Sequence, residues 1–326
     1  MDMEYRCFGN TDLETSVIGF GTFELNGEYG AINDDEVVQA IYRGLDLGVT
    51  CIDCAPIYGF GHAEEVVGKA LGSRRKDVML LTKCGIRWAE GGRRVWDGSR
   101  DSILKEIDES LTRLQTDYVD LYLVHYPPSQ LGTPLEETLG TLEDIRQSGK
   151  ARYIGVSNYG LDDLKASLDL APIAANQVVY NLFDRRNEEG IAFAREKGVG
   201  VMTHGSLSSG LLAGTFARGT VFADDDWRRH GNVRGLPLMV GENFARNLEV
   251  VEKLKEVARS LGKTQPQLAV NWVLSNPGVT VALTGCRNTK EIEDNVGATG
   301  WALSTEDKAR IKEIMQEAVG TSVAAN

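Results

Sequence analysis

The chain has 326 residues, of which 42% are hydrophobic and 25% charged, and its formal net charge is −12. This composition is that of an ordinary globular protein. The acidic balance argues against nucleic acid or an anionic membrane as a general partner, because the long-range field repels polyanions. No apolar stretch approaches the length of a membrane span, and the start, MDMEYRCFGN, lacks the features of a leader, so we expect a cytoplasmic protein.

The predicted elements begin with a β-hairpin around residues 10–12, which we expect to close the bottom of the fold. Eight short apolar runs follow, namely SVIGFGT, VTCIDCA, VMLLTKC, VDLYLVHY, ARYIGVSN, ANQVVY, GVGVMTHG and VTVALTG. Continuous apolar runs indicate strands covered on both faces, and their alternation with helices indicates parallel pairing. Helical patterns lie between and after these runs, at residues 34–48, 63–71, 100–114, 134–148, 161–168, 187–197, 244–261, 265–275 and 289–296.

Eight strand–helix units predict an α/β fold, a (β/α)8 TIM barrel. One domain over residues 1–326 is the simplest organisation, because no linker or low-complexity stretch divides the chain. A doubly wound open sheet is the alternative, but GFGTFE lacks the third glycine of a dinucleotide-binding turn. The longest irregular region, residues 213–243, follows the seventh strand and is typical of a lid or binding loop, with a disordered surface loop as the alternative.

Five cysteines, an odd number, do not indicate a disulfide framework. Cys51 and Cys54 form a CxxC pair that suggests a redox or metal site, but they flank Asp53 within a predicted strand and no second pair completes a zinc site. We therefore favour core packing for both. The four histidines form no HxH or HExxH motif, so we expect no metal.

Four ionisable residues close three consecutive strands of the predicted barrel. Asp53 and Tyr58 follow the second strand, Lys83 ends the third and His125 ends the fourth. Each residue alone has a structural explanation: a helix cap, a loop aromatic, a partly buried lysine and a core histidine. Because chemistry in this fold is built at the carboxyl ends of the strands, their joint placement predicts one site.

These four side chains suit proton transfer coupled to hydride transfer at a carbonyl. A phenol has a pKa of about 10, and the ammonium of Lys83 is expected to lower the pKa of Tyr58 by favouring the phenolate. Asp53 would keep Lys83 charged, and His125 would hydrogen-bond the substrate carbonyl. Neither a metal nor a covalent intermediate is required.

The spacing of these four residues resembles the catalytic tetrad of the aldo-keto reductases. The surrounding segments also resemble that family: GFGTF, IDCAPIYGFGHAEEVVGKAL, LLTKCG, SLTRLQTDYVDLYLVHYP, KARYIGVSNYG, NQVVYNLF and GSLSSGLLAG. The likeness runs from about Gly9 to Leu303 and is similar above all to a bacterial subgroup that includes inositol-locus and general-stress reductases. It implies a (β/α)8 barrel that binds extended NAD(P)H at its mouth without a Rossmann domain.

The resemblance also implies roles for individual residues. Tyr58 becomes the general acid/base, Lys83 the group that lowers its pKa, Asp53 the partner of that lysine, and His125 the donor that orients the carbonyl. The same likeness implies cofactor contacts from Gly21, Thr22, Phe23, Asp53, Ser157, Asn158, Gln177, His204, Gly205, Ser206, Leu207, Gly210, Gly285, Cys286, Arg287, Glu291, Asp294 and Asn295.

Three of these positions leave cofactor properties open. His204 stands where many relatives carry an aromatic residue that stacks on the nicotinamide, and it either replaces that ring neutrally or alters cofactor affinity. Arg287 is expected to bind a 2′-phosphate, which favours NADP(H). Glu291 would repel that phosphate, so NAD(H) stays the alternative.

The expected substrate pocket is aromatic and contains Phe23, Tyr29, Trp88, Tyr126 and, from the long loop, Trp227. The basic cluster Arg228, Arg229, His230 and Arg234 follows three aspartates, and ion pairs with Asp224, Asp225 and Asp226 are the default expectation. The cluster would otherwise attract an anionic substrate or cover the pyrophosphate. The sequence ends in the short tail GTSVAAN, which favours an open site for small aldehydes, ketones or sugars.

Two other classes of function stay open at this stage. A barrel aldolase would use Lys83 to form a Schiff base, but that needs a lysine with a lowered pKa, whereas Asp53 favours the charged amine. A regulatory protein would bind the cofactor with negligible turnover. Nothing in the sequence indicates an oligomeric state.

Overall fold

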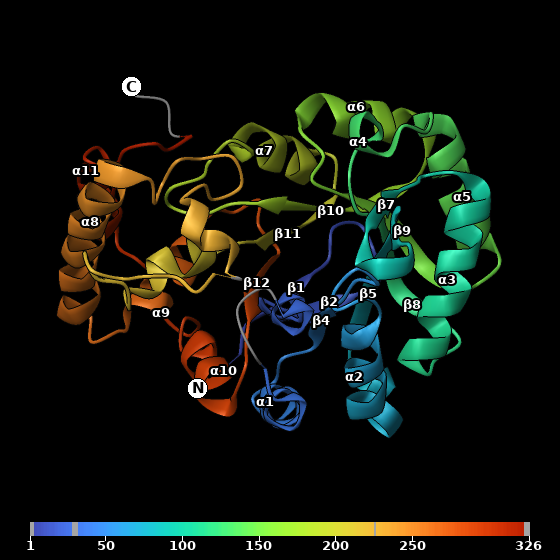
Figure 1. Ribbon diagram of the computed structural model, residues 1–326, viewed down its shortest axis with the longest axis horizontal. Helices are drawn as coiled ribbons and strands as arrows, with labels where there is room; N and C mark the ends of the chain where they lie inside the picture. Colours follow the sequence, from blue (N-terminus) through green and yellow to red (C-terminus); the bar gives the residue numbers. More distant parts are fainter. Residues whose placement is uncertain (1–2, 28–31, 225, 323–326) are drawn as a thin grey trace.

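The computed structural model describes residues 3–27, 32–224 and 226–322. Eight strands form a closed barrel in the order β10-β11-β12-β3-β4-β5-β8-β9, and every pair in it is parallel. The predicted (β/α)8 TIM barrel is therefore confirmed (Figure 1). The barrel strands are β3 (Ile18–Gly21), β4 (Cys51–Asp53), β5 (Met79–Cys84), β8 (Val119–Val124), β9 (Ala151–Ser157), β10 (Ile173–Val179), β11 (Gly200–His204) and β12 (Val281–Gly285).

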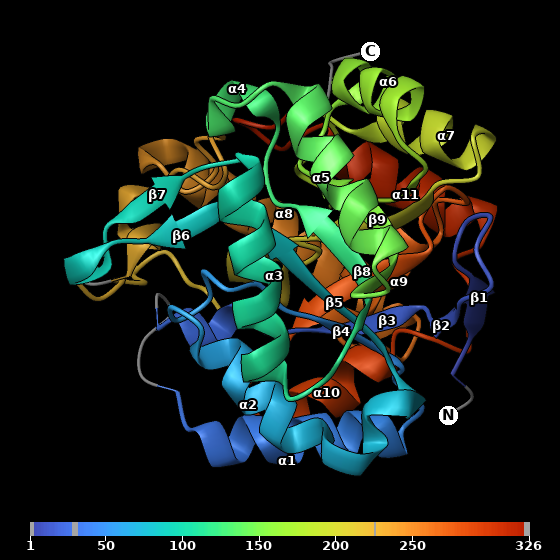
Figure 2. The ribbon, with the colours of Figure 1, turned by 90° about the vertical axis from the view of Figure 1, so that its right-hand side faces the viewer.

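Helices cover the outside of the barrel (Figures 1 and 2). In α1 the apolar residues Val37, Ala40, Ile41 and Gly44 recur at helical spacing and are buried, which fixes this helix against the strands. The helices are α1 (Asp34–Asp46), α2 (His62–Leu71), α3 (Arg100–Leu114), α4 (Pro128–Leu131), α5 (Leu135–Gln147), α6 (Leu161–Leu170), α7 (Glu188–Glu196), α8 (Gly241–Ser260), α9 (Gln265–Leu274), α10 (Thr289–Val296) and α11 (Thr305–Met315).

The predicted hairpin is present as β1 (Tyr5–Cys7) paired with β2 (Glu14–Ser16). From its turn Phe8 and Leu13 pack against the side chains that fill the barrel interior, and Phe8 is fully buried. A Cβ at Gly200 would lie 2.4 Å from the Phe8 ring, so only glycine fits there. Burial of a phenylalanine contributes about 1.5–3 kcal/mol to stability. Because Gly200 begins β11, the hairpin closes the end of the barrel at which this strand begins.

Four of the five cysteines are buried in the core, and Cys7 is exposed. Cys51 faces the barrel interior, Cys54 lies between strands and helices, and both are free thiols. Burial raises the pKa of each thiol far above its usual range, so neither is a reactive thiolate. In the described part of the chain no helix combines the length and the apolar character that crossing a membrane requires.

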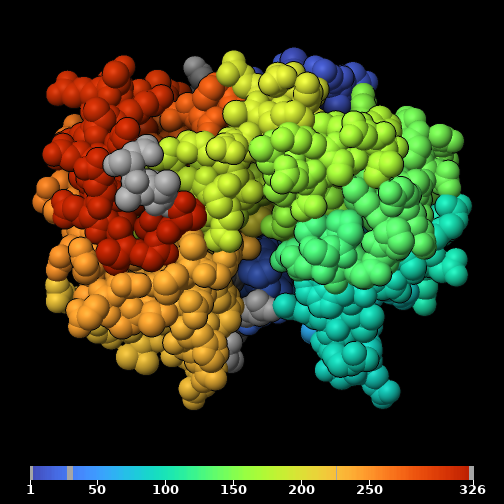
Figure 3. All heavy atoms as spheres, turned by 90° about the horizontal axis from the view of Figure 1, so that it is seen from above, coloured from blue at the N-terminus to red at the C-terminus, as the bar shows by residue number. Residues whose placement is uncertain are grey.

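Two excursions flank the open end of the barrel. The first is a hairpin of β6 (Ile86–Trp88) and β7 (Arg94–Trp96), which follows β5 and projects from the body of the molecule (Figure 2). The second, which we call the β11–α8 segment, comprises residues 205–224 and 226–240 and confirms the long loop expected after the seventh strand. It carries the short helices η4 (Ser208–Ala213) and η5 (Trp227–His230). Figure 3 shows a hollow between the orange and the teal parts of the surface.

Candidate active site

The carboxyl ends of the barrel strands bring together most of the predicted site residues. Asp53 is the last residue of β4, Lys83 the last but one of β5, and His125 follows β8 directly. On four of the five remaining strands the equivalent places are held by Gly21, Ser157, His204 and Gly285, each the last residue of its strand. Because the strands are parallel, all these groups lie at one end of the barrel.

Lys83 is fully buried and its ammonium is surrounded by oxygen atoms. Its Nζ donates to Asp53 Oδ1 at 2.6 Å, to the Cys54 carbonyl at 2.9 Å and to the Tyr58 hydroxyl at 3.2 Å. Asp53 also accepts a hydrogen bond from Gln177 Nε2 at 2.8 Å. These acceptors hold the amine as a buried ammonium, which disfavours the Schiff-base alternative.

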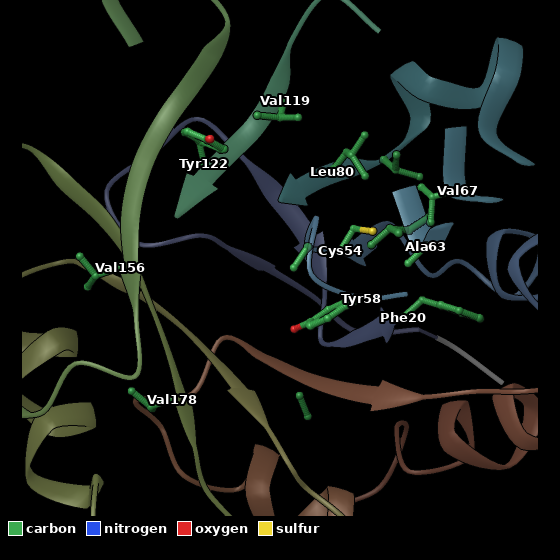
Figure 4. Close-up of a cluster of buried hydrophobic side chains, with 14 of the residues drawn as sticks. Phe20, Cys54, Tyr58, Ala63, Val67, Leu80, Val119, Tyr122, Val156 and Val178 are labelled. Atoms are coloured by element: carbon green, nitrogen blue, oxygen red, sulfur yellow. The ribbon is translucent and has the colours of Figure 1, made fainter. Parts of the chain in front are cut away.

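Tyr58 lies in the turn after β4 and is 7% exposed. Its ring makes edge contacts with Phe23 at 5.2 Å and His125 at 5.9 Å between centroids. Figure 4 shows its hydroxyl directed away from the apolar cluster around Ala63 and Val67. The turn thus places the phenol beside Lys83 while its ring packs into the core.

The direction of the Tyr58 pKa differs from the sequence expectation. Burial, and after it the negative charge of Asp53, raise the pKa of Tyr58 well above its usual range. The expectation that Lys83 leaves Tyr58 with a lowered pKa is therefore wrong for this environment. Removal from water penalises the phenolate more than the neighbouring ammonium favours it. The phenol keeps its proton at neutral pH and is suited to donate it.

His125 is held by its backbone and by ring stacking. Its backbone N–H donates to the Cys84 carbonyl at 2.9 Å, and its ring stacks on that of Tyr126 with 5.1 Å between the centroids. Burial lowers the pKa of His125 well below its usual range, and the positive charge of Lys83 acts in the same direction. The imidazole is therefore neutral at physiological pH and can donate one hydrogen bond without carrying a charge.

A cleft of about 560 Å³ opens above these groups. Asp53, Tyr58 and His125 line it, whereas Lys83 lies behind them. Most of the residues expected at the cofactor also line it: Gly21, Phe23, Ser157, Asn158, Gln177, His204, Gly205, Ser206, Leu207, Gly210, Gly285, Arg287, Glu291, Asp294 and Asn295. Two do not, because Thr22 is buried with its hydroxyl on the Asp53 carbonyl, and Cys286 is buried against Asn295.

The expected aromatic pocket needs correction. Tyr126 and Phe23 line the cleft. Trp88 does not line the cleft and is partly buried against the core, where its ring lies 5.8 Å from that of Phe60 and 5.7 Å from the Arg113 guanidinium. Trp227 packs against the core under α8. Tyr29 lies outside the described residues.

The β6–β7 hairpin contributes three lining residues that were not predicted from the sequence, and the first of them is Ile86 on β6. Arg94 and Trp96 lie on β7, and Trp96 makes an edge contact with Tyr126 at 5.0 Å. The alternating pattern IRW-AEGGR-RVW, with two glycines at the turn, is a hairpin signal that would have placed them. Together with Tyr126 and His125, Trp96 continues an aromatic wall from the tetrad toward the mouth.

Polar groups at the floor of the cleft bond to one another. Asn158, at a positive φ of 63°, donates to the His125 carbonyl at 2.9 Å and contacts His204 Nε2 through its Oδ1 at 3.0 Å. Burial lowers the pKa of His204 well below its usual range, so this imidazole is neutral and Nε2 carries the proton that Asn158 accepts. His204 Nδ1 is buried and has no partner among the described atoms, so one acceptor stays available to a bound group.

At the far end of the cleft Arg287 and Glu291 bind each other. Arg287 Nη2 lies 2.7 Å from Glu291 Oε1, and the Arg287 backbone N–H donates to Oε2 at 2.9 Å. The two signals that seemed opposed in the sequence therefore form one ion pair. Glu24, which was not predicted, also lines this region, and burial raises its pKa to about 7.

The lining fits an extended dinucleotide. Gly205 and Gly210 have positive φ values of 67° and 94°, and such backbone can lie close to phosphates. Side-chain amides and a hydroxyl at Asn158, Gln177 and Ser157 supply the donors and acceptors that a carboxamide needs. The tetrad and the ion pair of Arg287 lie in the same cleft, so a single ligand can contact both.

Comparisons with known proteins agree with the family resemblance seen in the sequence. The sequence model of the Aldo/keto reductase family matches residues 17–316. The chain is 36% identical to aldo-keto reductase YhdN of Bacillus subtilis, over 98% of this chain and 96% of that protein. It is 32% identical to aldo-keto reductase yakc of Schizosaccharomyces pombe, whose name specifies NADP(+), over 97% of this chain and 92% of the relative.

Among solved structures, that of the glycerol dehydrogenase from Gluconobacter oxydans superimposes with a TM-score of 0.89 at 32% identity. The match covers 100% of this chain and 99% of that one. The subgroup expected from the sequence stays a prediction. The chain belongs to the aldo/keto reductase family.

Proposed function

We propose that this protein transfers hydride from NAD(P)H to the carbonyl of a small aldehyde, ketone or aldose, with Tyr58 as the proton donor. As an aldo/keto reductase, the protein is an NAD(P)-dependent oxidoreductase. The observation that carries the proposal is the contact of the Lys83 ammonium with both Asp53 Oδ1 and the Tyr58 hydroxyl, beside His125.

Each tetrad residue has a distinct task in this proposal. A bound NADPH or NADH supplies the hydride that reaches the carbonyl carbon. Tyr58 gives its proton to the carbonyl oxygen, and Lys83 stabilises the phenolate that this leaves. Asp53 keeps Lys83 charged and in place, whereas neutral His125 orients the carbonyl oxygen through a hydrogen bond.

We propose that the cofactor lies along the residues at the carboxyl ends of β9 to β12. Ser157, Asn158 and Gln177 would hold the carboxamide, and Gly205 to Gly210 the pyrophosphate. NADP(H) is the favoured form, supported by Arg287 and by the NADP(+) named for the yeast relative. Arg287 already forms an ion pair with Glu291, so a 2′-phosphate would have to displace the Glu291 carboxylate. NAD(H) therefore stays the alternative.

The wall of the cleft supports a small substrate. Tyr126, Trp96 and Ile57 give it an apolar, partly aromatic surface beside the tetrad. The glycerol dehydrogenase acts, by its name, on a small polyol, which fits the same class of substrate. We also propose a cytoplasmic location, since all five cysteines are free thiols and reducing compartments preserve them.

The test is steady-state oxidation of NADPH and of NADH over a panel of aldehydes, ketones and aldoses, together with cofactor fluorescence titration. We expect turnover with at least one small aldehyde and tight binding of NADPH. A protein that binds NADPH but turns over none of the panel would contradict the proposal and support the regulatory alternative. Hydride trapping that labels Lys83 with substrate would support the aldolase alternative instead.

A further inference from the structure

The basic residues of the β11–α8 segment are not equivalent. Arg228 forms a largely buried ion pair with Asp226 at 2.6 Å, and Arg229 forms an exposed one with Asp224 at 3.2 Å. Arg234 forms no ion pair with any residue that the structure describes. Its side chain nevertheless lines the cleft.

Arg234 is also held in a backbone conformation that does not suit arginine. Val233 and Leu236 exchange two backbone hydrogen bonds of 2.7 and 2.9 Å across a two-residue turn. The two central residues, Arg234 and Gly235, have φ values of 50° and 86°, which is the pattern of a type I′ turn. Asn-Gly is the favoured pair in this turn, so an arginine at the first position is strained. Strain of this kind is common at functional sites.

The turn is fixed from below. Arg186 Nη2 donates to the Arg234 carbonyl at 3.0 Å. Arg186 is itself held by two hydrogen bonds of 2.8 Å to the buried carboxylate of Asp184. This support fixes the Arg234 backbone, so the side chain leaves the turn from a defined point.

The Arg234 side chain lies just beyond the end of β11, on the same cleft as the tetrad. A Cβ built on Gly205 would lie 3.3 Å from Arg234 Nε, so the guanidinium covers the residue that follows His204. The positive charge of Arg234 acts on the pKa of Tyr58 and of His125, in both cases toward a lower value. Arg234 is therefore close to the groups that would hold the reacting carbonyl.

A second arginine lies across the cleft. Arg94 lines it from the hairpin after β5, and its charge also lowers the pKa of His125. In the barrel order β5 and β11 are separated by β4, β3 and β12, so their loops rise from opposite walls. Two guanidinium groups thus face a cleft at the surface of a protein with a net charge of −12.

We propose that Arg234, assisted by Arg94, binds an anionic group of the substrate, so that the preferred substrates are small carbonyl compounds bearing a carboxylate or a phosphate. Guanidinium groups bind both anions through charge-assisted hydrogen bonds. The inference rests on the proposed carbonyl reduction and names its substrate class. Arg234 acts in recognition and takes no part in proton transfer.

The experiment compares charged and neutral substrates of matched shape. The pairs are succinic semialdehyde with butanal, for a carboxylate, and glyceraldehyde 3-phosphate with glyceraldehyde, for a phosphate. The test variants are Arg234→Asn, which gives the favoured Asn-Gly turn, and Arg234→Lys, which keeps the charge. Arg229→Asn is the matched control, because Arg229 is exposed in the same segment and paired with Asp224.

We expect wild type to prefer at least one charged substrate over its neutral partner in kcat/KM. Arg234→Asn should lower kcat/KM for that substrate at least about tenfold, mainly through KM, since a charge-assisted bond is lost. The neutral partner should change less than about threefold, and Arg234→Lys should lie between. Added salt should weaken the charged substrate only. The melting temperature of Arg234→Asn should be unchanged or higher.

Three results would overturn the inference. Equal losses for charged and neutral substrates would make Arg234 a structural residue. A rise in the NADPH dissociation constant of Arg234→Asn, with no change in substrate preference, would assign Arg234 to the cofactor phosphates. If the wild type turns over neutral aldehydes well and shows no preference for charged ones, the inference is wrong and the proposed function still holds. Absence of turnover on every substrate would instead contradict the proposed function.

Discussion

The tetrad at the ends of β4, β5 and β8 and Arg234 of the β11–α8 segment lie at the same cleft, yet the protein holds their charges differently. Lys83 is fully buried and bonded to Asp53, with neighbouring strands in fixed register. Arg234 is exposed and depends on a strained turn supported by Arg186. In the account proposed here, proton transfer belongs to the wall of the barrel, whereas substrate choice belongs to loops that can change without altering the barrel.

The largest expected effect comes from breaking the buried pair. Lys83→Met should lower kcat about a thousandfold, within the range of general acid–base catalysis. It should also lower the free energy of unfolding by roughly 3–5 kcal/mol, because Asp53 is left buried without its charge partner. Denaturant unfolding and steady-state kinetics measure the two effects. The double variant Lys83→Met with Asp53→Asn should regain most of the stability and none of the activity. Turnover within tenfold of wild type would contradict the assignment.

The ion pair at the far end of the cleft should show an intermediate effect. Arg287→Ala is expected to raise the NADPH dissociation constant about tenfold and to change that for NADH less than about twofold, because only the former has a phosphate to bind. Glu291→Gln should act in the opposite direction, since it frees Arg287. Fluorescence titration with both cofactors measures this. Equal shifts for the two cofactors would remove the 2′-phosphate from Arg287.

A smaller effect should separate the two tryptophans of the β6–β7 hairpin. Trp96→Ala should raise KM for carbonyl substrates about fivefold, because an aromatic wall of the cleft is lost. Trp88→Ala is the matched control and should leave KM within about twofold, since this ring packs against Phe60 and Arg113 outside the cleft. The reverse order of effects would restore Trp88 to the substrate pocket.

The smallest change is expected from pH. His125 has a lowered pKa and stays neutral in mild acid, and Tyr58 has a raised pKa and keeps its proton in mild base. The kcat for reduction at saturating cofactor should therefore be level from about pH 6 to about pH 9. Saturation matters because Glu24, with a pKa of about 7, becomes anionic in this range and can change cofactor affinity. An inflection near pH 6.5 that His125→Gln removes would show that His125 is charged in use.

The sequence predicted the barrel well because buried parallel strands leave a strong signal. The eight apolar runs match the eight strands, and the helix over 100–114 has the same bounds in the structure. The β6–β7 hairpin was missed although its alternating pattern and its two turn glycines signal it, since it interrupts the strand–helix repeat between β5 and α3. The organisation as one domain and the roles of the site residues stay predictions.

The environments of individual side chains were harder to predict from the sequence. The sign of the Tyr58 pKa shift depends on burial by segments distant in the chain, which spacing does not reveal. The pairing of Arg287 with Glu291 was not predicted, because Arg287 precedes α10 and the rule for residues four apart applies to a helix surface. The Arg234-Gly235 pair indicates a turn in the sequence. The hydrogen bond from Arg186 that supports this turn joins residues 48 apart, so it could not be predicted from the sequence.

The most direct test of the account is the rate of hydride transfer in a single turnover, followed by loss of reduced-nicotinamide absorbance. Tyr58→Phe is compared with Tyr126→Phe, which removes a hydroxyl from a neighbouring ring in the same cleft. We predict a loss of at least about a hundredfold for Tyr58→Phe and less than about threefold for Tyr126→Phe, with cofactor affinity retained in both. Equal rates for Tyr58→Phe and wild type would show that another group protonates the carbonyl oxygen.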